Sequence, residues 1–263
     1  MVPGRSLQIL QTDGSSQDPS SELWRSFNLN FQVLVSGVPC PEINAVWNRN
    51  CTNYTGKVRA LGAGAEAGAM ASIVCDTSLV WHRVTADSLA QSLEARFQYF
   101  TERVMPHFKK DSMYHTCVFV PSYFDFVKVR NWFKSSDLDY SEVSEYSKDK
   151  KIAQARDMFY HNEKHFLLYT ERCHFYRRFR LKGIRHLIFY QPPTFGWMFS
   201  ELSNLLQKSF QNPRGGSETN MSITVIYTKY DIQRIKLCVG AETASKMLSS
   251  ENSRHIFQPG AAE

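Results

Sequence analysis

The second part of this chain alternates short strand-like runs with longer helical segments, and this order limits the possible folds more than any other feature. Most of the runs are rich in Val, Ile, Leu, Phe and Tyr, and they are too short for helices. Five segments are predicted strands: Thr116–Val120, Ser141–Glu145, Phe166–Tyr169, Leu187–Tyr190 and Ile223–Tyr227. Strands that alternate with helices form right-handed βαβ units, so we expect an α/β fold with a mostly parallel sheet flanked by helices.

Amphipathic segments account for the helices that flank this sheet. We expect them at residues 86–108, 122–134, 151–161, 197–210, 230–239 and 241–248. In the first helix, apolar residues recur at spacings of three and four, which predicts one buried stripe. These residues are Leu89, Leu93, Phe97, Phe100 and Val104. Ser122 is the expected N-cap of the second helix.

Composition divides the chain into four parts. Residues 1–22 are rich in Gly, Ser, Pro, Gln and Asp and are expected to be disordered. Residues 23–85 include the predicted strand Phe31–Ser36 and a short helix, and we interpret them as the remnant of a preceding domain followed by an irregular linker. Residues 86–250 form the complete α/β domain, and residues 251–263 are a C-terminal tail. The glycine-rich stretch Gly62–Ala71 has neither a clear strand before it nor Lys-Ser/Thr after it, so we interpret it as a flexible insertion rather than a phosphate loop.

A basic and aromatic connection joins two of the predicted strands, Phe166–Tyr169 and Leu187–Tyr190. In open α/β sheets, ligands bind at the loops beyond the carboxyl ends of the strands, where this connection begins. Cations interleaved with aromatic rings suit a polyanion that also offers bases for stacking, so the connection predicts RNA binding. The candidate RNA contacts are Arg172, His174, Tyr176, Arg177, Arg178, Arg180, Lys182 and Arg185.

Other interpretations of this connection stay open. A solvated surface helix of an ordinary α/β protein would carry a similar run of charges. Phe175 and Phe179 fit core positions as well as stacking positions. Arginine binds carboxylates as readily as phosphates, so acidic segments of a protein partner are an alternative to RNA.

The overall charge favours an anionic partner without requiring one, because 31 Lys and Arg outnumber 25 Asp and Glu and leave a net charge of +6. The six cysteines are scattered and include no C-x-x-C pair. We therefore expect free thiols in a reducing compartment and no zinc site. No segment has the length and apolarity of a signal peptide or a membrane span, so no membrane contact is expected.

The patterns of common catalytic sites are missing from the sequence. It contains no G-x-x-x-x-G-K-[ST], G-x-S-x-G or H-E-x-x-H motif. Cys173 lies among cations that would lower the pKa of its thiol, but its neighbour His174 does not supply a positioned base. His161 and His165 lie at a helix end in a pattern that does not favour zinc. We assign no catalytic residue, metal ligand, cofactor or small-molecule substrate.

The order of strands, helices and basic loop resembles the second RecA-like domain of superfamily-two RNA helicases. Cys117–Ser122 resembles motif IV, and Leu168–Glu171 resembles the opening of motif V. Gln32–Val38 resembles the last strand of the first RecA-like domain, which agrees with a remnant at residues 23–85. Motif VI is absent, since the chain reads T-F-G-W-M-F-S-E-L after Pro193. The resemblance therefore implies a helicase-like fold without the arginine that would reach the γ-phosphate of ATP.

Four longer motifs resemble a narrower family. They are Val120–Val127, Tyr169–Arg178, Lys182–Tyr190 and Tyr227–Asp231. These motifs are similar to the digestive organ expansion factor family, whose members are also called U3 small nucleolar RNA-associated protein 25. The similarity runs from about Leu23 to Phe257. Family members also carry an acidic N-terminal region and a first RecA-like domain, so the resemblance implies that this chain is a truncated form or a partial gene product.

The same resemblance implies a non-catalytic RNA- and protein-binding scaffold of the small-subunit processome, acting in early pre-rRNA cleavage and 18S rRNA maturation. The implied partners are pre-rRNA, U3 snoRNA and other processome proteins, and the implied location is the nucleolus. One alternative is a module that docks only to proteins during ribosome assembly. The other is an ATP-dependent RNA helicase, which would need the Walker lysine that this sequence lacks.

Overall fold

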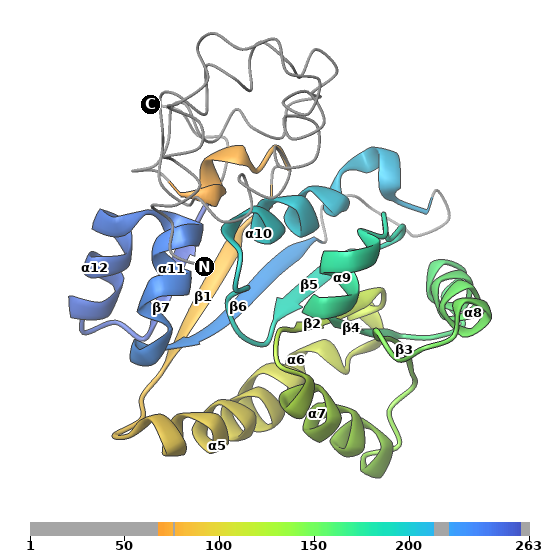
Figure 1. Cartoon of the computed structure of the whole chain (residues 1–263), viewed down its shortest axis with the longest axis horizontal. Coiled ribbons are helices and arrows are strands. Elements are labelled where there is room, and N and C mark those ends of the chain that lie inside the picture. The colour runs from red at the N-terminus through yellow and green to blue at the C-terminus, as the bar shows by residue number, and fades with distance from the viewer. Residues whose placement is uncertain (1–67, 76, 213–220, 259–263) are drawn as a thin grey trace, which may run out of the picture. The chain divides into compact units, whose positions relative to one another are not determined.

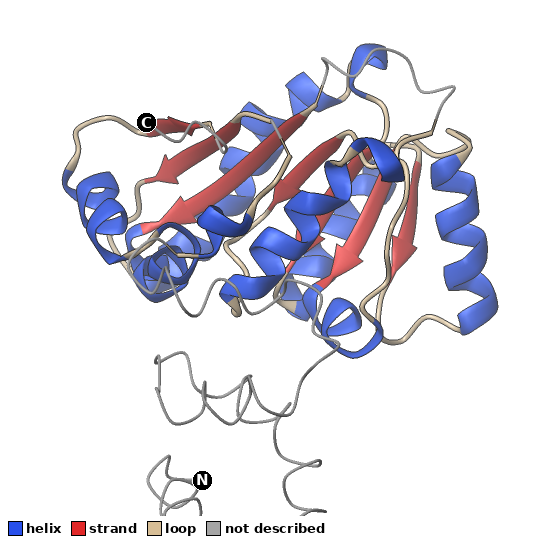
Figure 2. Ribbon diagram, turned by 90° about the horizontal axis from the view of Figure 1, so that it is seen from above, coloured by secondary structure: helices blue, strands red, loops and turns tan. Residues whose placement is uncertain are grey.

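Seven strands form one sheet in the part of the chain that the computed structural model describes, residues 68–75, 77–212 and 221–258 (Figure 1). The strands lie side by side in the order β3-β4-β2-β5-β6-β1-β7 (Figure 2). Their bounds are β1 Leu79–Val84, β2 Thr116–Val120, β3 Tyr140–Val143, β4 Phe166–Thr170, β5 His186–Phe189, β6 Ser222–Thr228 and β7 Arg254–Phe257. The helices are α5 Leu89–Tyr99, α6 Met105–Phe108, α7 Tyr123–Ser135, α8 Asp149–Tyr160, α9 Glu171–Arg177, α10 Gly196–Ser203, α11 Ile232–Val239 and α12 Ala241–Ser249.

The five predicted strands are all present and parallel to one another. β2 pairs with β4 on one side and with β5 on the other, β3 pairs with β4, and β5 pairs with β6. The predicted α/β fold with a mostly parallel sheet flanked by helices is therefore confirmed. The order β3-β4-β2 places the carboxyl ends of three strands, and the loops that follow them, at one edge of the sheet.

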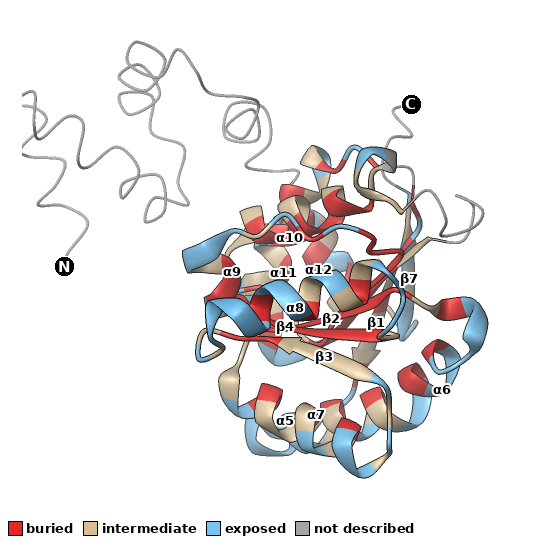
Figure 3. Ribbon diagram, turned by 90° about the vertical axis from the view of Figure 1, so that its right-hand side faces the viewer, coloured by how far each residue is buried: buried red, intermediate tan, exposed pale blue. Residues whose placement is uncertain are grey.

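The sheet separates two hydrophobic cores, because successive side chains of a strand point to opposite faces. In β2, Cys117 and Phe119 enter the core that α8 to α12 cover. Val118 and Val120 enter the core that α5, α6 and α7 cover. Figure 3 shows both layers, with the central strands buried and β3 half-buried at its edge. Strands covered on both faces explain the nearly continuous apolar runs of the sequence.

Helix boundaries agree with the sequence in part. The Ser122 side chain accepts a hydrogen bond from the Asp125 backbone N–H at 3.4 Å, which confirms the expected N-cap of α7. The helix expected at 197–210 ends as α10 at Ser203 and continues as two 3-10 turns, Asn204–Leu206 and Lys208–Phe210.

The helix expected at 86–108 is three pieces, because a π-helical turn, Phe100–Val104, separates α5 from α6. The predicted buried stripe is wrong at its start, since Leu89 is 63% exposed and Leu93 is 50% exposed. The buried positions of α5 are Ser92 and Arg96. The face of α5 that carries Arg96 points towards the core because the Arg96 guanidinium pairs with the buried Asp231 carboxylate.

Two strands lie where the sequence indicated none. β1 is in the range assigned to the linker, yet it pairs in parallel with β6 along its whole length. This strand was not predicted because His82 and Arg83 interrupt its apolar pattern. In the structure both side chains have partners: the His82 ring hydrogen-bonds the Tyr99 hydroxyl at 3.0 Å, and the Arg83 guanidinium donates to the Leu248 carbonyl at 2.9 Å. β7 lies in the expected tail and pairs antiparallel with β1. The sheet therefore extends two strands beyond residues 116–228.

The end of the glycine-rich stretch is packed rather than free. Gly68 has a φ of 66° and precedes the 3-10 turn Ala69–Ser72. A Cβ at Gly68 would lie 2.4 Å from the Gly240 backbone nitrogen, so this contact requires glycine. The disordered tail, the strand Phe31–Ser36 and the remnant of a preceding domain fall on residues outside those described, and they stay predictions.

Candidate nucleic-acid interface

The first turn of α9 is fixed by the last residue of β4. The Thr170 hydroxyl accepts a hydrogen bond from the Cys173 backbone N–H at 3.4 Å, which caps the helix. The same hydroxyl donates to the Glu145 carboxylate at 2.8 Å. Glu145 belongs to the segment that follows β3, so this pair of hydrogen bonds ties the loops after two neighbouring strands together.

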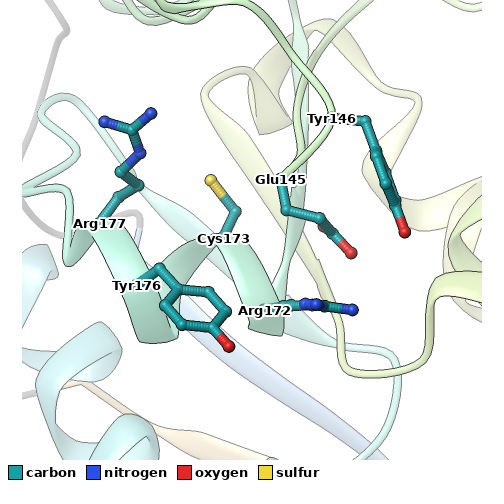
Figure 4. A pocket seen from close by; sticks show the side chains of 6 residues that line it. All are labelled: Glu145, Tyr146, Arg172, Cys173, Tyr176 and Arg177. Carbon is teal, nitrogen blue, oxygen red and sulfur yellow. The ribbon is translucent and has the colours of Figure 1, made fainter.

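A hollow of about 310 Å³ lies between these two loops (Figure 4). Glu145 and Tyr146 line it from the segment after β3. The residues of α9 that line it are Arg172, Cys173, Tyr176 and Arg177. A second hollow of about 280 Å³ shares Arg172 and Tyr176 with the first. Its other lining residues are Pro121, Glu171, Phe175 and Phe195.

Six of the eight candidate RNA contacts are exposed, and they do not form one loop. Arg172, Tyr176 and Arg177 lie on α9 at the carboxyl ends of the strands. The connection then crosses to the amino ends, where the Arg185 backbone N–H donates to the His115 carbonyl at 3.0 Å. Lys182 lies near that opposite edge. The residues predicted to form one basic loop therefore lie at two opposite edges of the sheet. Those on α9 lie at the carboxyl edge.

His174 and Arg185 are buried, at 1% and 5% exposure. The His174 ring hydrogen-bonds the Tyr169 hydroxyl at 3.1 Å and stacks on Trp197 with ring centroids 5.9 Å apart. The Arg185 guanidinium lies 5.8 Å from the centroid of the Tyr114 ring. Both side chains hold the fold together, so burial rules them out as contacts to RNA in this structure.

Contacts within the chain engage several of the exposed cations. The Arg177 guanidinium lies 2.9 Å from the Asp149 carboxylate, with both side chains largely exposed. Arg178 ends α9 in the left-handed conformation, with a φ of 43°, and its guanidinium lies 4.4 Å from the centroid of the Trp197 ring. Exposed pairs of these kinds are weak, so they leave such side chains available to an anion.

The two phenylalanines whose role was open pack against the core. Phe175 and Phe179 are partly buried beside the core on the α9 face of the sheet. The Arg156 guanidinium lies 4.8 Å from the centroid of the Phe179 ring. In contrast, Tyr176 is 67% exposed. Tyr176 is therefore the aromatic residue of α9 with a ring free to stack on a ligand.

Cys173 does not have the lowered thiol pKa that its basic neighbours favoured. The side chain is 1% exposed, and burial raises the pKa of its thiol from 9.0 to about 11, with the nearby Glu145 carboxylate adding to the effect. Desolvation thus outweighs the neighbouring Arg177, which acts in the opposite direction. At neutral pH the thiol is protonated and is a poor nucleophile.

The loops on the other side of α9 are held by buried polar contacts. Glu171 accepts a hydrogen bond from the Thr194 backbone N–H at 2.8 Å, and burial raises the pKa of its carboxyl group. Asp231 accepts from Gln191 at 2.7 Å and pairs with Arg96 at 2.6 Å. These contacts fix the segments after β4, β5 and β6, so the carboxyl edge is a rigid platform.

Comparison of the sequence with known proteins identifies the family of this chain. The family described as "Utp25, C-terminal domain" matches residues 69–257. The chain belongs to the Utp25 family. One relative, "U3 small nucleolar RNA-associated protein 25 homolog" of Xenopus tropicalis, is 40% identical over 259 residues, which cover 97% of this chain and 33% of that protein. Another, "U3 small nucleolar RNA-associated protein 25" of Schizosaccharomyces japonicus, is 33% identical over 229 residues, which cover 87% of this chain and 35% of that protein.

The chain thus spans about a third of the length of these curated relatives. Among solved structures, the Escherichia coli DEAD-box protein SrmB bound to regulator of ribonuclease activity A is similar with a TM-score of 0.45 and 13% identity. The similar region covers 62% of this chain and 84% of that chain. The predicted family is confirmed, and the matched Utp25 range includes β1 and β7 as well as the predicted strands.

The Utp25 domain carries further exposed cations that sequence reasoning missed. Lys148, Lys150 and Lys151 are exposed at the start of α8, next to Tyr146, which is 66% exposed. The signal was present in the run Y-S-K-D-K-K, which follows a predicted strand just as the α9 segment does. Because β3 and β4 are parallel neighbours, these lysines flank the same edge as Arg172 and Arg177.

Among the residues that the structure describes, no group of three or more His, Cys, Asp or Glu side chains is placed to hold a metal ion. Within the same ranges, no helix combines the length and the apolar character needed to cross a bilayer.

Proposed function

We propose that this chain is a non-catalytic RNA- and protein-binding scaffold of the small-subunit processome, which acts with pre-rRNA or U3 snoRNA in the nucleolus during early pre-rRNA cleavage and 18S rRNA maturation. Its relatives are named for association with U3 small nucleolar RNA. The observation that carries the RNA-binding proposal is the basic surface, defined as Lys148, Lys150 and Lys151 at the start of α8 together with Arg172 and Arg177, which line the hollow with Tyr146 and Tyr176.

This basic surface has the composition of a binding site for single-stranded nucleic acid. Such sites combine cations that track the phosphates with aromatic rings on which bases stack. The cations come from two adjacent segments that Thr170 and Glu145 tie together, so these segments are held side by side before RNA arrives. Segments that are ordered in advance lose less conformational entropy on binding.

The same proposal includes that this chain does not catalyse ATP hydrolysis. The full sequence holds no Walker motif. The segment after β5, where the helicase resemblance would place arginines, instead begins α10 with Gly196, Trp197 and Met198. Phosphoryl transfer by helicase-like enzymes depends on such a cation at the γ-phosphate.

A salt series of fluorescence-anisotropy titrations with the full chain and single-stranded pre-rRNA fragments tests RNA binding. The double variant Lys150→Glu/Arg172→Glu removes two cations of the basic surface. It should weaken binding at low salt and reduce the magnitude of the slope of log K against log salt by about 1.4, or about 0.7 for each phosphate contact.

A matched control carries the same charge change at the opposite edge. Lys110 and Lys134 are both exposed near the amino ends of the strands, so Lys110→Glu/Lys134→Glu should change RNA binding far less. Absence of salt-dependent binding by folded wild-type protein, or an equal loss in the control, would overturn the RNA-binding proposal.

Exposed apolar side chains support the protein-binding half of the proposal. Phe124, in the first turn of α7, is 89% exposed, and Leu89 and Leu93 form an exposed apolar pair on α5. Aromatic residues such as Phe are enriched in the buried centres of protein interfaces. A module that binds only proteins would lose a partner when Phe124 or Leu93 is changed to Ser and would show no salt-dependent RNA binding.

A further inference from the structure

The hollow between the β3 and β4 loops combines three chemical features on one small surface. A carboxylate, Glu145, two tyrosines and two arginines of α9 line it (Figure 4). Its volume of about 310 Å³ is at the lower end for small-molecule sites and fits a group as small as one base. A ligand for it needs hydrogen-bond donors, a flat ring and a negative charge.

The Glu145 carboxylate is held in place rather than free to turn away. One of its oxygens accepts a hydrogen bond from the buried Thr170 hydroxyl at 2.8 Å. An ionised carboxylate accepts hydrogen bonds and donates none. Whatever group faces Glu145 in the hollow must therefore present donors to it.

The two tyrosines offer flat faces at the sides of the hollow. Tyr146 and Tyr176 are 66% and 67% exposed. The Tyr146 ring packs edge-on against Tyr123 at a centroid distance of 4.8 Å, and the Arg172 guanidinium lies 5.9 Å from the centroid of the Tyr176 ring. These contacts restrict both rings while leaving much of each side chain accessible. Nucleic-acid bases stack on exposed rings of this kind.

We propose that this hollow binds one unpaired guanine of an RNA strand, with its Watson–Crick edge on Glu145 and its ring against Tyr146 or Tyr176. Guanine presents two adjacent donors on that edge, N1–H and N2–H₂, which a carboxylate can accept together. Adenine and cytosine pair a single donor group with a ring-nitrogen acceptor that a carboxylate repels, and uracil flanks its one N–H with two carbonyl oxygens. This inference rests on the proposed RNA-binding function and names the ligand of the same surface.

The ligand must be unpaired because a cytosine occupies the Watson–Crick edge of guanine in a duplex. Recognition of bases in RNA occurs mainly in single-stranded loops and ends for this reason. Arg172 and Arg177 line the same hollow and can meet the phosphates on either side of the base.

The second hollow extends the site by one neighbouring base. It has a volume of about 280 Å³, and Arg172 and Tyr176 line both hollows. Two consecutive bases can therefore lie on either side of Tyr176. Phe175 and Phe195, which line the second hollow, provide apolar contact for that neighbouring base.

Anisotropy titrations of the full chain with five RNAs, at one salt concentration, test the inference. Each RNA is a nine-nucleotide oligouridine whose central position carries guanine, adenine, cytosine, uracil or no base. The guanine RNA should bind about tenfold more tightly than the others, the range expected of a two-hydrogen-bond base contact. Glu145→Gln keeps an acceptor for Thr170 but faces the base with an amide donor, so it should abolish this preference. Loss of one negative charge should strengthen binding of the abasic RNA slightly and of the other RNAs alike.

Two further variants separate the ring contact from general effects. Tyr176→Leu should weaken binding of the base-bearing RNAs more than binding of the abasic RNA. Glu163→Gln, an exposed carboxylate after the end of α8, is the matched control and should preserve the preference for guanine. Thermal unfolding of each variant establishes that it is folded.

The outcomes separate this inference from the proposed function. Salt-dependent binding with equal affinity for all five RNAs would overturn the guanine site and leave RNA binding intact. A preference for guanine that survives Glu145→Gln would also overturn it. Failure of folded wild-type protein to bind any of the RNAs would overturn the proposed RNA binding and the guanine site together.

Discussion

Arg96 of α5 and Asp231, which precedes α11, form a buried ion pair with 2.6 Å between guanidinium nitrogen and carboxylate oxygen. The two side chains are 2% and 5% exposed. The same Asp231 oxygen accepts hydrogen bonds from the Thr228 backbone N–H at 2.8 Å and the Thr228 hydroxyl at 2.9 Å. The pair therefore joins the helix on one face of the sheet to the carboxyl end of a central strand.

Breaking this pair should destabilise the fold strongly. Arg96→Met leaves the Asp231 carboxylate buried without its cation, and loss of one partner of a buried pair costs about 3–5 kcal/mol. Chemical denaturation measures this loss as a change in the free energy of unfolding.

A double-mutant cycle with Asp231→Asn isolates the interaction. The amide introduced by Asp231→Asn carries no charge that needs the Arg96 guanidinium beside it. The double variant should therefore lose at least 1 kcal/mol less, by the order of magnitude of coupled contacts, than the two single variants together. Strictly additive losses would show that the ion pair contributes no specific coupling.

The same ion pair explains where sequence reasoning about the first helix failed. Periodicity at Leu89, Leu93 and Phe97 indicated the buried face, because apolar residues usually face the core. A cation with a buried partner on a distant segment overrides that preference, and no local pattern connects Arg96 to Asp231. Long apolar runs such as Phe166–Tyr169, which forms most of β4, were predicted well because burial on both faces of the sheet produces an apolar pattern that is visible in the local sequence.

Two substitutions within the predicted stripe, one on α5 and one in the turn after it, should therefore differ strongly in their effect on the free energy of unfolding. Leu93→Ala removes a side chain that is 50% exposed and should change the free energy of unfolding by less than about 1 kcal/mol. Phe100→Ala, in the π-helical turn, removes a fully buried ring and should cost about 3–5 kcal/mol. Similar losses for the two variants would contradict the orientation of α5 described here.

The sequence identified most of the residue types of the candidate site but not how its residues are arranged in space. The run of basic and aromatic residues correctly indicated that the segment forming α9 begins at the carboxyl end of a strand. It could not show that the chain then crosses the sheet and buries Arg185, because that depends on a backbone hydrogen bond to His115, 70 residues earlier in the sequence. The lysines of α8 were overlooked because their proximity to α9 depends on the pairing of β3 with β4.

Acid should destabilise the protein through two buried histidines, His115 and His186, which are 1% and 0% exposed. Burial, with Arg185 nearby, lowers the pKa of each from 6.5 to about 4. Between these values the unfolded chain binds protons that the folded chain does not, so stability falls as pH decreases from about 6.5 towards 4. The buried carboxyls Asp125 and Glu171, whose pKa values are raised by burial, oppose this loss in part.

His115→Asn tests the histidine contribution. Asn tolerates the left-handed conformation of residue 115, which has a φ of 60°, and it does not titrate. Relative to wild type, the variant should lose about 2 kcal/mol less stability between pH 7 and pH 5, as the linkage relation gives for one such histidine. Denaturant titrations at both pH values measure the difference, and an unchanged pH dependence would show that His115 is not kept neutral by the fold.

Cys173 should react slowly although it lines the hollow and has arginines on both sides. Burial raises the pKa of its thiol from 9.0 to about 11, which leaves about a hundredfold less thiolate at pH 8 than an ordinary cysteine has. Alkylation by iodoacetamide, followed by mass spectrometry of the Cys173 peptide, should therefore be at least about a hundredfold slower in the native chain than in the same chain unfolded in guanidinium chloride, because burial of the side chain also restricts access. Comparable rates in the two states would show an ionised, accessible thiol and would revive a nucleophilic role for Cys173.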